Sequence, residues 1–86
     1  MPEVSRFFGV VIRFHYDDHP PAHFHARYGG HKAAIGIHSL EVLDGWLPPR
    51  VLGLVKEWAS LHKAELLEDW RLARRLAPPK PIAALE

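Results

Sequence analysis

Hydrophobic and polar residues alternate through most of the first half of the chain. In residues 8–16 the positions on one side of an extended strand would be Phe8, Val10, Ile12 and Phe14. Val11, Arg13 and His15 would lie on the other side. The same period of two recurs over residues 23–28, and further apolar stretches occupy residues 31–38 and 40–45. The Gly29-Gly30 pair separates two of these stretches, and Asp44-Gly45 ends the last one. The pattern therefore predicts three or four antiparallel strands.

The second half of the chain shows helical spacing instead. Within residues 48–77, one apolar stripe comprises Val51, Leu54, Val55, Trp58 and Leu61, and a second, out of phase with it, comprises Leu66, Leu67, Trp70 and Ala73. The change of phase predicts a break at residues 61–63, and therefore two helices, with one kinked helix as the alternative. Pro48 or Pro49 suits the first helical turn. Three later prolines end the helical region and leave a proline-rich tail over residues 78–86.

Strands followed by helices predict an α+β fold in which the helices cover one face of the sheet. A length of 86 residues fits a single domain over residues 1–86. We therefore expect a three- to four-stranded antiparallel sheet with two C-terminal helices, or one kinked helix, packed on one face.

Gly29-Gly30 fixes which residues share a face of this sheet. A two-residue hairpin turn there would place Tyr28 opposite His31, Arg27 opposite Lys32 and His25 opposite Ala34. The residues that alternate with Arg27 and His25 along the strand, such as Phe24 and Ala26, would lie beneath the helices. The uncovered face would then carry a cluster of cationic and titratable side chains: Arg13, His15, His23, His25, Arg27, Lys32 and, at its end, His38.

Charge and composition narrow the chemistry of that face. The net charge is only +1 with His neutral, so any attraction for anions must be local. The chain has no cysteine, which excludes disulfides, thiolate metal sites and cysteine nucleophiles. No signal peptide and no apolar stretch of membrane-spanning length is recognisable, so we expect a cytoplasmic protein without a membrane partner.

Three kinds of chemistry fit the cluster. His23 and His25 are candidate catalytic residues, because two imidazoles beside an Arg or Lys that holds a phosphate suit acid/base cleavage of RNA. The same His-x-His pair is a candidate metal site, with a third ligand from His15, Asp18 or His19, although the neighbouring cations would repel a metal ion. Without any reaction, the face suits binding of RNA or of a partner's acidic segment. The alternative without any functional role is that these side chains form the solvent-exposed polar face that antiparallel sheets commonly have.

The motifs of the chain resemble those of a known bacterial family. Ser5, Arg6, Phe7 and Gly9 match an S-R-F-x-G start. The D-x-x-P-x-H-F-H and Y-G-G segments match through Asp18, Pro21, His23, Phe24, His25, Tyr28, Gly29 and Gly30. Leu47, Pro48, Arg50, Glu57, Trp58, His62, Glu65, Leu66, Leu67 and Trp70 match the L-P-x-R, E-W-x-x-x-H and E-L-L-x-x-W segments. The family is domain of unknown function 4160.

This resemblance implies a role but no mechanism. Members are small bacterial proteins often encoded beside a protein of domain of unknown function 2442, and the pair has been proposed as a toxin–antitoxin module. The resemblance thus implies a module component that binds a cognate small protein. The His/Arg face adds RNA as a candidate partner, and a homodimer is a further candidate assembly. The candidate binding residues are Arg13, His15, Arg27, Lys32 and Tyr28, and no cofactor is expected.

Overall fold

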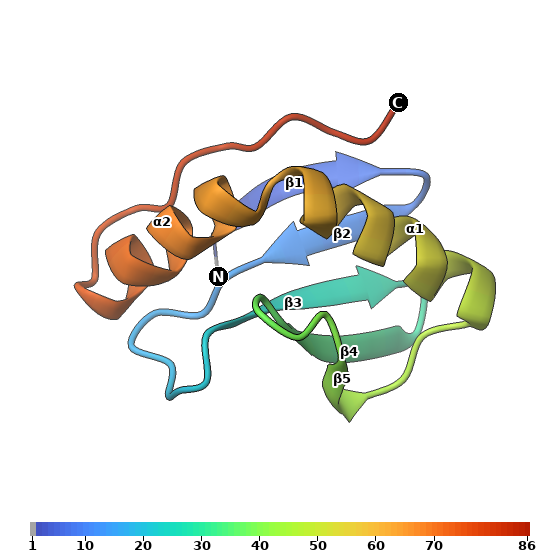
Figure 1. Cartoon of the computed structure of the whole chain (residues 1–86), viewed down its shortest axis with the longest axis horizontal. Coiled ribbons are helices and arrows are strands. Elements are labelled where there is room, and N and C mark those ends of the chain that lie inside the picture. Colours follow the sequence, from blue (N-terminus) through green and yellow to red (C-terminus); the bar gives the residue numbers. More distant parts are fainter. Residues whose placement is uncertain (1) are drawn as a thin grey trace.

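A five-stranded antiparallel sheet lies against two helices in the computed structural model, which describes residues 2–86 (Figure 1). The strands pair in chain order: β1 (Glu3–Phe7), β2 (Val10–Arg13), β3 (His23–Tyr28), β4 (His31–Gly36) and β5 (Val42–Gly45). The helices are α1 (Pro49–Leu61) and α2 (Lys63–Arg74). The α+β class and the two helices on one face are confirmed, whereas the expected number of strands was too small.

The strand that the sequence pattern did not predict is β1. Residues 8–16 do not form one strand either, because the chain reverses at Phe8 and Gly9, which have φ angles of 47° and 82°, and β2 begins at Val10. These left-handed conformations are incompatible with a continuing strand. Phe8 sits in the resulting turn with 61% of its surface exposed, so the prediction that it shares a side with the buried Val10, Ile12 and Phe14 is wrong.

The predicted register between β3 and β4 is confirmed. The hairpin at Gly29-Gly30 pairs Tyr28 with His31, Arg27 with Lys32, His25 with Ala34 and His23 with Gly36. Gly29 has a φ of 58°, which explains why glycine occupies this turn. On the other side of β3, Arg13 of β2 pairs with His25. The cationic positions of three neighbouring strands therefore share one face.

The hydrophobic core fills the space between the sheet and the helices. The strands contribute Val10, Ile12, Phe24, Ala26, Ala33 and Ile35, the residue after β2 contributes Phe14, and the helices contribute Val51, Val55, Trp58, Ala59, Leu66 and Ala73. Trp58 is central, with its ring centroid 5.3 Å from that of Phe7 and 5.9 Å from that of Phe24. Leu61 departs from the predicted stripe: it ends α1 and is 67% exposed.

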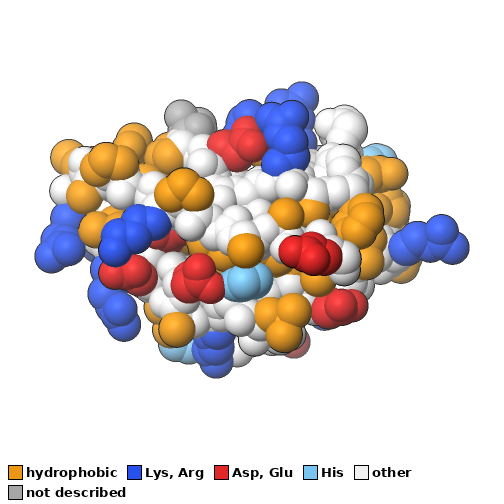
Figure 2. Space-filling view, turned by 90° about the horizontal axis from the view of Figure 1, so that it is seen from above, with side chains coloured by type: hydrophobic (Ala, Val, Ile, Leu, Met, Phe, Trp, Pro, Cys, Tyr) orange, Lys and Arg blue, Asp and Glu red, His pale blue; other side chains and the backbone are white. Residues whose placement is uncertain are grey.

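The tail over residues 78–86 forms neither helix nor strand but packs along β1 and the helices (Figure 1). The backbone N–H of Ile82 donates to the carbonyl of Val4 at 2.7 Å, and Trp58 Nε1 donates to the carbonyl of Ala83 at 2.8 Å. Figure 2 looks onto the molecule from above Figure 1 and shows charges of both signs scattered among hydrophobic side chains. No helix in residues 2–86 is long and apolar enough to cross a bilayer.

Candidate functional site

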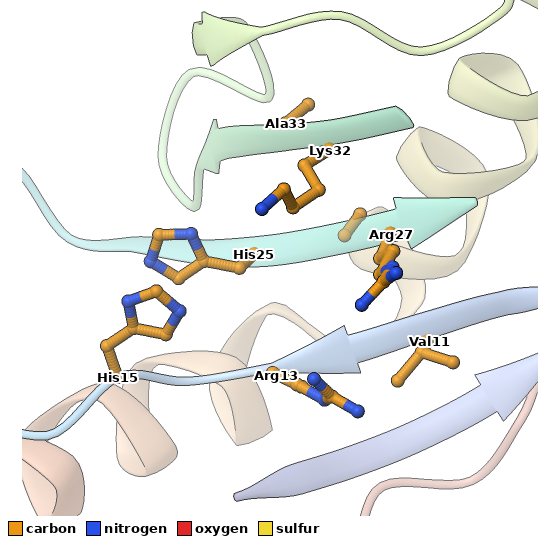
Figure 3. A pocket seen from close by; sticks show the side chains of 8 residues that line it. Val11, Arg13, His15, His25, Arg27, Lys32 and Ala33 are labelled. Carbon is orange, nitrogen blue, oxygen red and sulfur yellow. The ribbon is translucent and has the colours of Figure 1, made fainter. Parts of the chain in front are cut away.

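The sheet face opposite the helices carries a cavity of about 200 Å³, which we call the cationic cavity (Figure 3). Its charged lining comes from three neighbouring strands: Arg13 from β2, Arg27 from β3 and Lys32 from β4. The rest of the lining is Val11, His15, His25, Ala26 and Ala33. Within the described part of the chain, no Asp or Glu lines this cavity. Its electrostatic character therefore favours an anion.

Two features of the cationic cavity are unfavourable: a pair of like charges and a buried N–H group without an acceptor. Arg27 and Lys32 are directly paired across β3 and β4, and like charges in that position destabilise a sheet. Arg27 Nε donates to the carbonyl of Gly29 at 3.3 Å, and this contact neutralises no charge. Arg13 Nε is buried and has no acceptor among the residues described. A bound anion would supply the missing acceptor and reverse the sign of the Arg27–Lys32 interaction.

His15 and His25 form a stacked pair at one end of this cavity. Their ring centroids are 3.5 Å apart and the rings are nearly parallel, with an interplanar angle of 7°. Figure 3 shows the two rings face to face, His25 on β3 and His15 just beyond β2. Burial lowers the pKa of His15, and the adjacent His25 lowers it further. The Asp18 carboxylate opposes part of this decrease in the pKa of His15.

Asp18 holds His25 from the loop between β2 and β3. His25 Nε2 donates to Asp18 Oδ2 at 3.0 Å, and the backbone N–H of His19 donates to Oδ1 at 2.9 Å. Burial alone would raise the pKa of Asp18, but the hydrogen bonds from His25, from His19 and from His23 together lower it to about 2. Asp18 is thus an ionised carboxylate at any ordinary pH.

His23 lies deeper than its neighbours and is only 6% exposed. Its Nε2 is 2.8 Å from Asp18 Oδ2, its Nδ1 is 2.7 Å from the carbonyl of Pro21, and its ring lies 5.1 Å from that of Trp70. An ionised carboxylate and a carbonyl only accept hydrogen bonds, so both ring nitrogens of His23 face acceptors. These two contacts hold the ring in place beside Asp18.

A second cavity, of about 270 Å³, lies beside the same histidine pair, and we call it the acidic cavity. Its lining comprises His15, Asp18, His19, Pro21, His23, His25, Ala34, Leu43 and Asp44. It contains two carboxylates and, among residues 2–86, no Lys or Arg. Since His15 and His25 line both cavities, the stacked pair separates a surface suited to anions from one suited to cations. Donor atoms of His15, Asp18 and His25 all lie within 4.8 Å of one another.

The structure brings together most of the residues that the sequence pattern proposed. Arg13, His15, His25, Arg27 and Lys32 all line the cationic cavity. The remaining three do not: His23 is buried behind His25, Tyr28 lies in the row of Phe24 and Ala26 with 36% of its surface exposed, and His38 lies in the exposed turn after β4.

Asp18 is more central to the site than the sequence predicts. It was one of three options for a third metal ligand, whereas in the structure it is the carboxylate around which the histidines are arranged. The signal was its place in the D-x-x-P-x-H-F-H segment, five residues before His23. Asp44 was missed altogether, because only the pairing of β5 with β4 brings it opposite Ala34.

Residues 9–71 match the family model described as "Domain of unknown function (DUF4160)". The chain belongs to this family. No curated protein and no solved structure matches it. The DUF4160 segment contains every residue that lines the two cavities, from Val11 to Asp44, and ends before the tail. The site is therefore part of the DUF4160 domain itself.

Proposed function

We propose that this protein is the RNA-binding component of a toxin–antitoxin pair, and that the cationic cavity binds RNA phosphates. The observation that carries the proposal is the lining of that cavity. Arg13, Arg27 and Lys32 converge there from three strands, and no carboxylate of the described residues lines the cavity with them. Arg and Lys side chains are the principal phosphate ligands of nucleic-acid-binding proteins.

The charges on this face of the sheet favour an anionic ligand. The net charge of the whole chain is only +1, so three cations around one cavity are a local concentration of charge. A phosphate between Arg27 and Lys32 turns a repulsive pair into two attractive contacts. Its oxygens also provide an acceptor for the buried Nε of Arg13. Binding thus relieves costs that the free protein bears.

The stacked histidines favour RNA over an acidic peptide. Single-stranded RNA combines phosphates, which contact cations, with unstacked bases, which pack against aromatic rings including imidazole. His15 and His25 lie at the end of the cationic cavity and provide such rings. An acidic peptide would engage the cations alone.

The proposal concerns binding, and the histidines limit which cleavage chemistry is available. Both ring nitrogens of His23 are occupied by Asp18 and Pro21, so this residue has no free position for proton transfer to a bound phosphate. Of the candidate catalytic pair, His25 alone reaches the cationic cavity. An acid/base mechanism would therefore pair His25 with His15.

RNA binding is tested by fluorescence anisotropy with a labelled 12-nucleotide single-stranded RNA at low salt. The double substitution Arg27→Glu with Lys32→Glu should weaken binding at least tenfold, because it replaces two cations of the cavity with carboxylates. The matched control is Arg50→Glu with Lys63→Glu, which makes the same charge change on exposed residues of α1 and α2. Equal losses in both variants would show that only overall charge matters and would contradict the proposal.

The toxin–antitoxin part is tested by growth. The protein is expressed alone and together with the product of its neighbouring gene, and the two are tested for copurification. We expect either growth inhibition that the neighbour relieves, or a stable complex with a toxic neighbour. Absence of both toxicity and a copurifying partner would contradict this part while leaving the RNA-binding measurement intact.

A further inference from the structure

We propose that His15, Asp18 and His25 bind one divalent transition-metal ion at the edge of the acidic cavity, with His23 as the residue that positions Asp18. The site is distinct from the RNA phosphate site. It lies beside the same histidine pair but is lined by different charged residues.

The donor atoms are close to the spacing that coordination requires. Metal–ligand bonds of about 2.0–2.2 Å place neighbouring ligand atoms roughly 3.0–3.5 Å apart. His25 Nε2 and Asp18 Oδ2 are already 3.0 Å apart. All three donor atoms lie within 4.8 Å of one another, so closure on an ion needs a movement of less than about 2 Å between any two of them. Because a metal lies in the plane of each imidazole that binds it, the parallel rings of His15 and His25 must also rotate out of their stack. When the ion binds, His25 ligates through Nε2 as the neutral imidazole with its one proton on Nδ1. The Nε2 proton therefore leaves to solvent, Nδ1 takes one up where it does not already carry it, and the metal replaces the hydrogen bond.

The charge distribution resolves the objection that the neighbouring cations would repel a metal. Arg13, Arg27 and Lys32 line the cationic cavity, whereas Asp18 and Asp44 line the acidic one. An ion held by His15 and His25 on this side faces two carboxylates. The acidic cavity also has space for water or a substrate atom at the open coordination positions. Two imidazoles and one carboxylate select Zn²⁺, Co²⁺ or another late first-row ion over Mg²⁺ or Ca²⁺.

His23 gives the site the second layer that metal centres require. It contacts Asp18 Oδ2 through Nε2 at 2.8 Å, and its Nδ1 donates to the carbonyl of Pro21 at 2.7 Å. Packing of the ring against Trp70 of α2 fixes its orientation. This arrangement orients the carboxylate toward the stacked histidines, as partners of metal ligands do elsewhere. We therefore assign His23 to positioning instead of ligation.

Metal titration of the untagged full chain, after removal of metal with EDTA, tests the proposal. Zn²⁺ binding is followed by calorimetry and Co²⁺ binding by visible absorbance, and each should reach one equivalent per chain. His15→Ala and Asp18→Asn should each weaken binding by about 100-fold or more, and His23→Gln by about 10- to 100-fold with unchanged stoichiometry. His31→Ala and His38→Ala are the controls, because both residues are exposed and outside the acidic cavity.

A second measurement does not depend on variants that fold. In ¹H–¹⁵N spectra of the histidine rings of the wild-type chain, Zn²⁺ should shift the nitrogens of His15 and His25 and leave those of His31 and His38 unchanged. Less than about a tenth of an equivalent of bound metal, or full affinity in His15→Ala, would overturn the proposal. The Arg27→Glu, Lys32→Glu variant should bind one equivalent, so loss of RNA binding and loss of metal binding are separable.

Discussion

The two faces of the sheet are built from alternate residues of the same strands, yet they differ in what they do. In β3, Phe24 and Ala26 are fully buried beneath the helices, while His25 and Arg27 face the cationic cavity. The covered face packs against Trp58 and stabilises the fold. The uncovered face holds charges that repel one another and a buried Arg13 Nε without an acceptor. In β3 the alternation of Phe24 and Ala26 with His25 and Arg27 separates residues that stabilise the fold from residues proposed to bind a ligand. His23 departs from this alternation, because it is buried against Trp70 of α2.

The sharpest way to break this comparison is to truncate one residue on each face. Phe24→Ala should lower the free energy of unfolding by about 3–5 kcal/mol, because it removes a fully buried ring and leaves a cavity beside Trp58. Arg27→Ala should change it by less than about 0.5 kcal/mol, since Arg27 is exposed. Urea unfolding followed by circular dichroism measures both. Comparable losses would show that the uncovered face carries the stability too.

A carboxyl group on the covered side gives the second prediction. Asp69 of α2 is 1% exposed, with Oδ1 accepting from the backbone N–H of Lys80 at 2.7 Å and Oδ2 without a partner among the described residues. Burial raises its pKa to about 6, and the nearby Glu68 and Glu65 add to the rise. The folded state thus binds this proton more tightly than the unfolded state, so its contribution to stability falls as pH rises from about 4 to about 6.

Asp69→Asn removes this titration. Between pH 4.5 and pH 7.5, the unfolding free energy of the variant should rise relative to wild type by roughly 2 kcal/mol, in favour of the variant at the higher pH. Urea unfolding at the two pH values gives the difference directly. Because Asp18 and the histidines are unchanged in both proteins, their titrations cancel. A pH-independent difference would contradict the account of Asp69.

The smallest predicted effect is that of Lys32→Glu, which should raise the stability of the fold but lower its affinity for RNA. Lys32→Glu replaces the like-charge pair with Arg27 by an attractive one and should stabilise the chain by about 0.2–1 kcal/mol. The same change should weaken RNA binding, because it places a carboxylate in the cationic cavity. Thermal unfolding and anisotropy on one preparation measure both. A variant that gains affinity, or that loses stability, would show that Lys32 does not take part as described.

The predictable part of the fold rests on two local signals. Gly29-Gly30 determined the register between β3 and β4, and with it the shared face of Arg27, Lys32 and His25. The change of helical phase located the break between α1 and α2 at His62. The first signal is the local conformation that a Gly-Gly turn adopts, and the second is the spacing of apolar residues. Both can be read from a single sequence.

The unpredictable part depends on contacts between distant segments. The turn that separates β1 from β2 places a bulky Phe8 at positive φ, which no propensity indicates. The burial of His23 comes from Trp70, 47 positions later in the chain, and from a carboxylate in the preceding loop. The stacking of His15 on His25 requires the path of the β2–β3 loop. Such contacts decide which histidine is buried and which two stand between the cavities.

The salt dependence of RNA binding tests the central claim most directly. If Arg13, Arg27 and Lys32 each contact one phosphate, the logarithm of the association constant should fall with the logarithm of salt concentration with a slope of about −2. Arg27→Ala should reduce the magnitude of that slope by about 0.7. A slope near zero, or one that Arg27→Ala leaves unchanged, would contradict the assignment of the cationic cavity as the RNA-binding site.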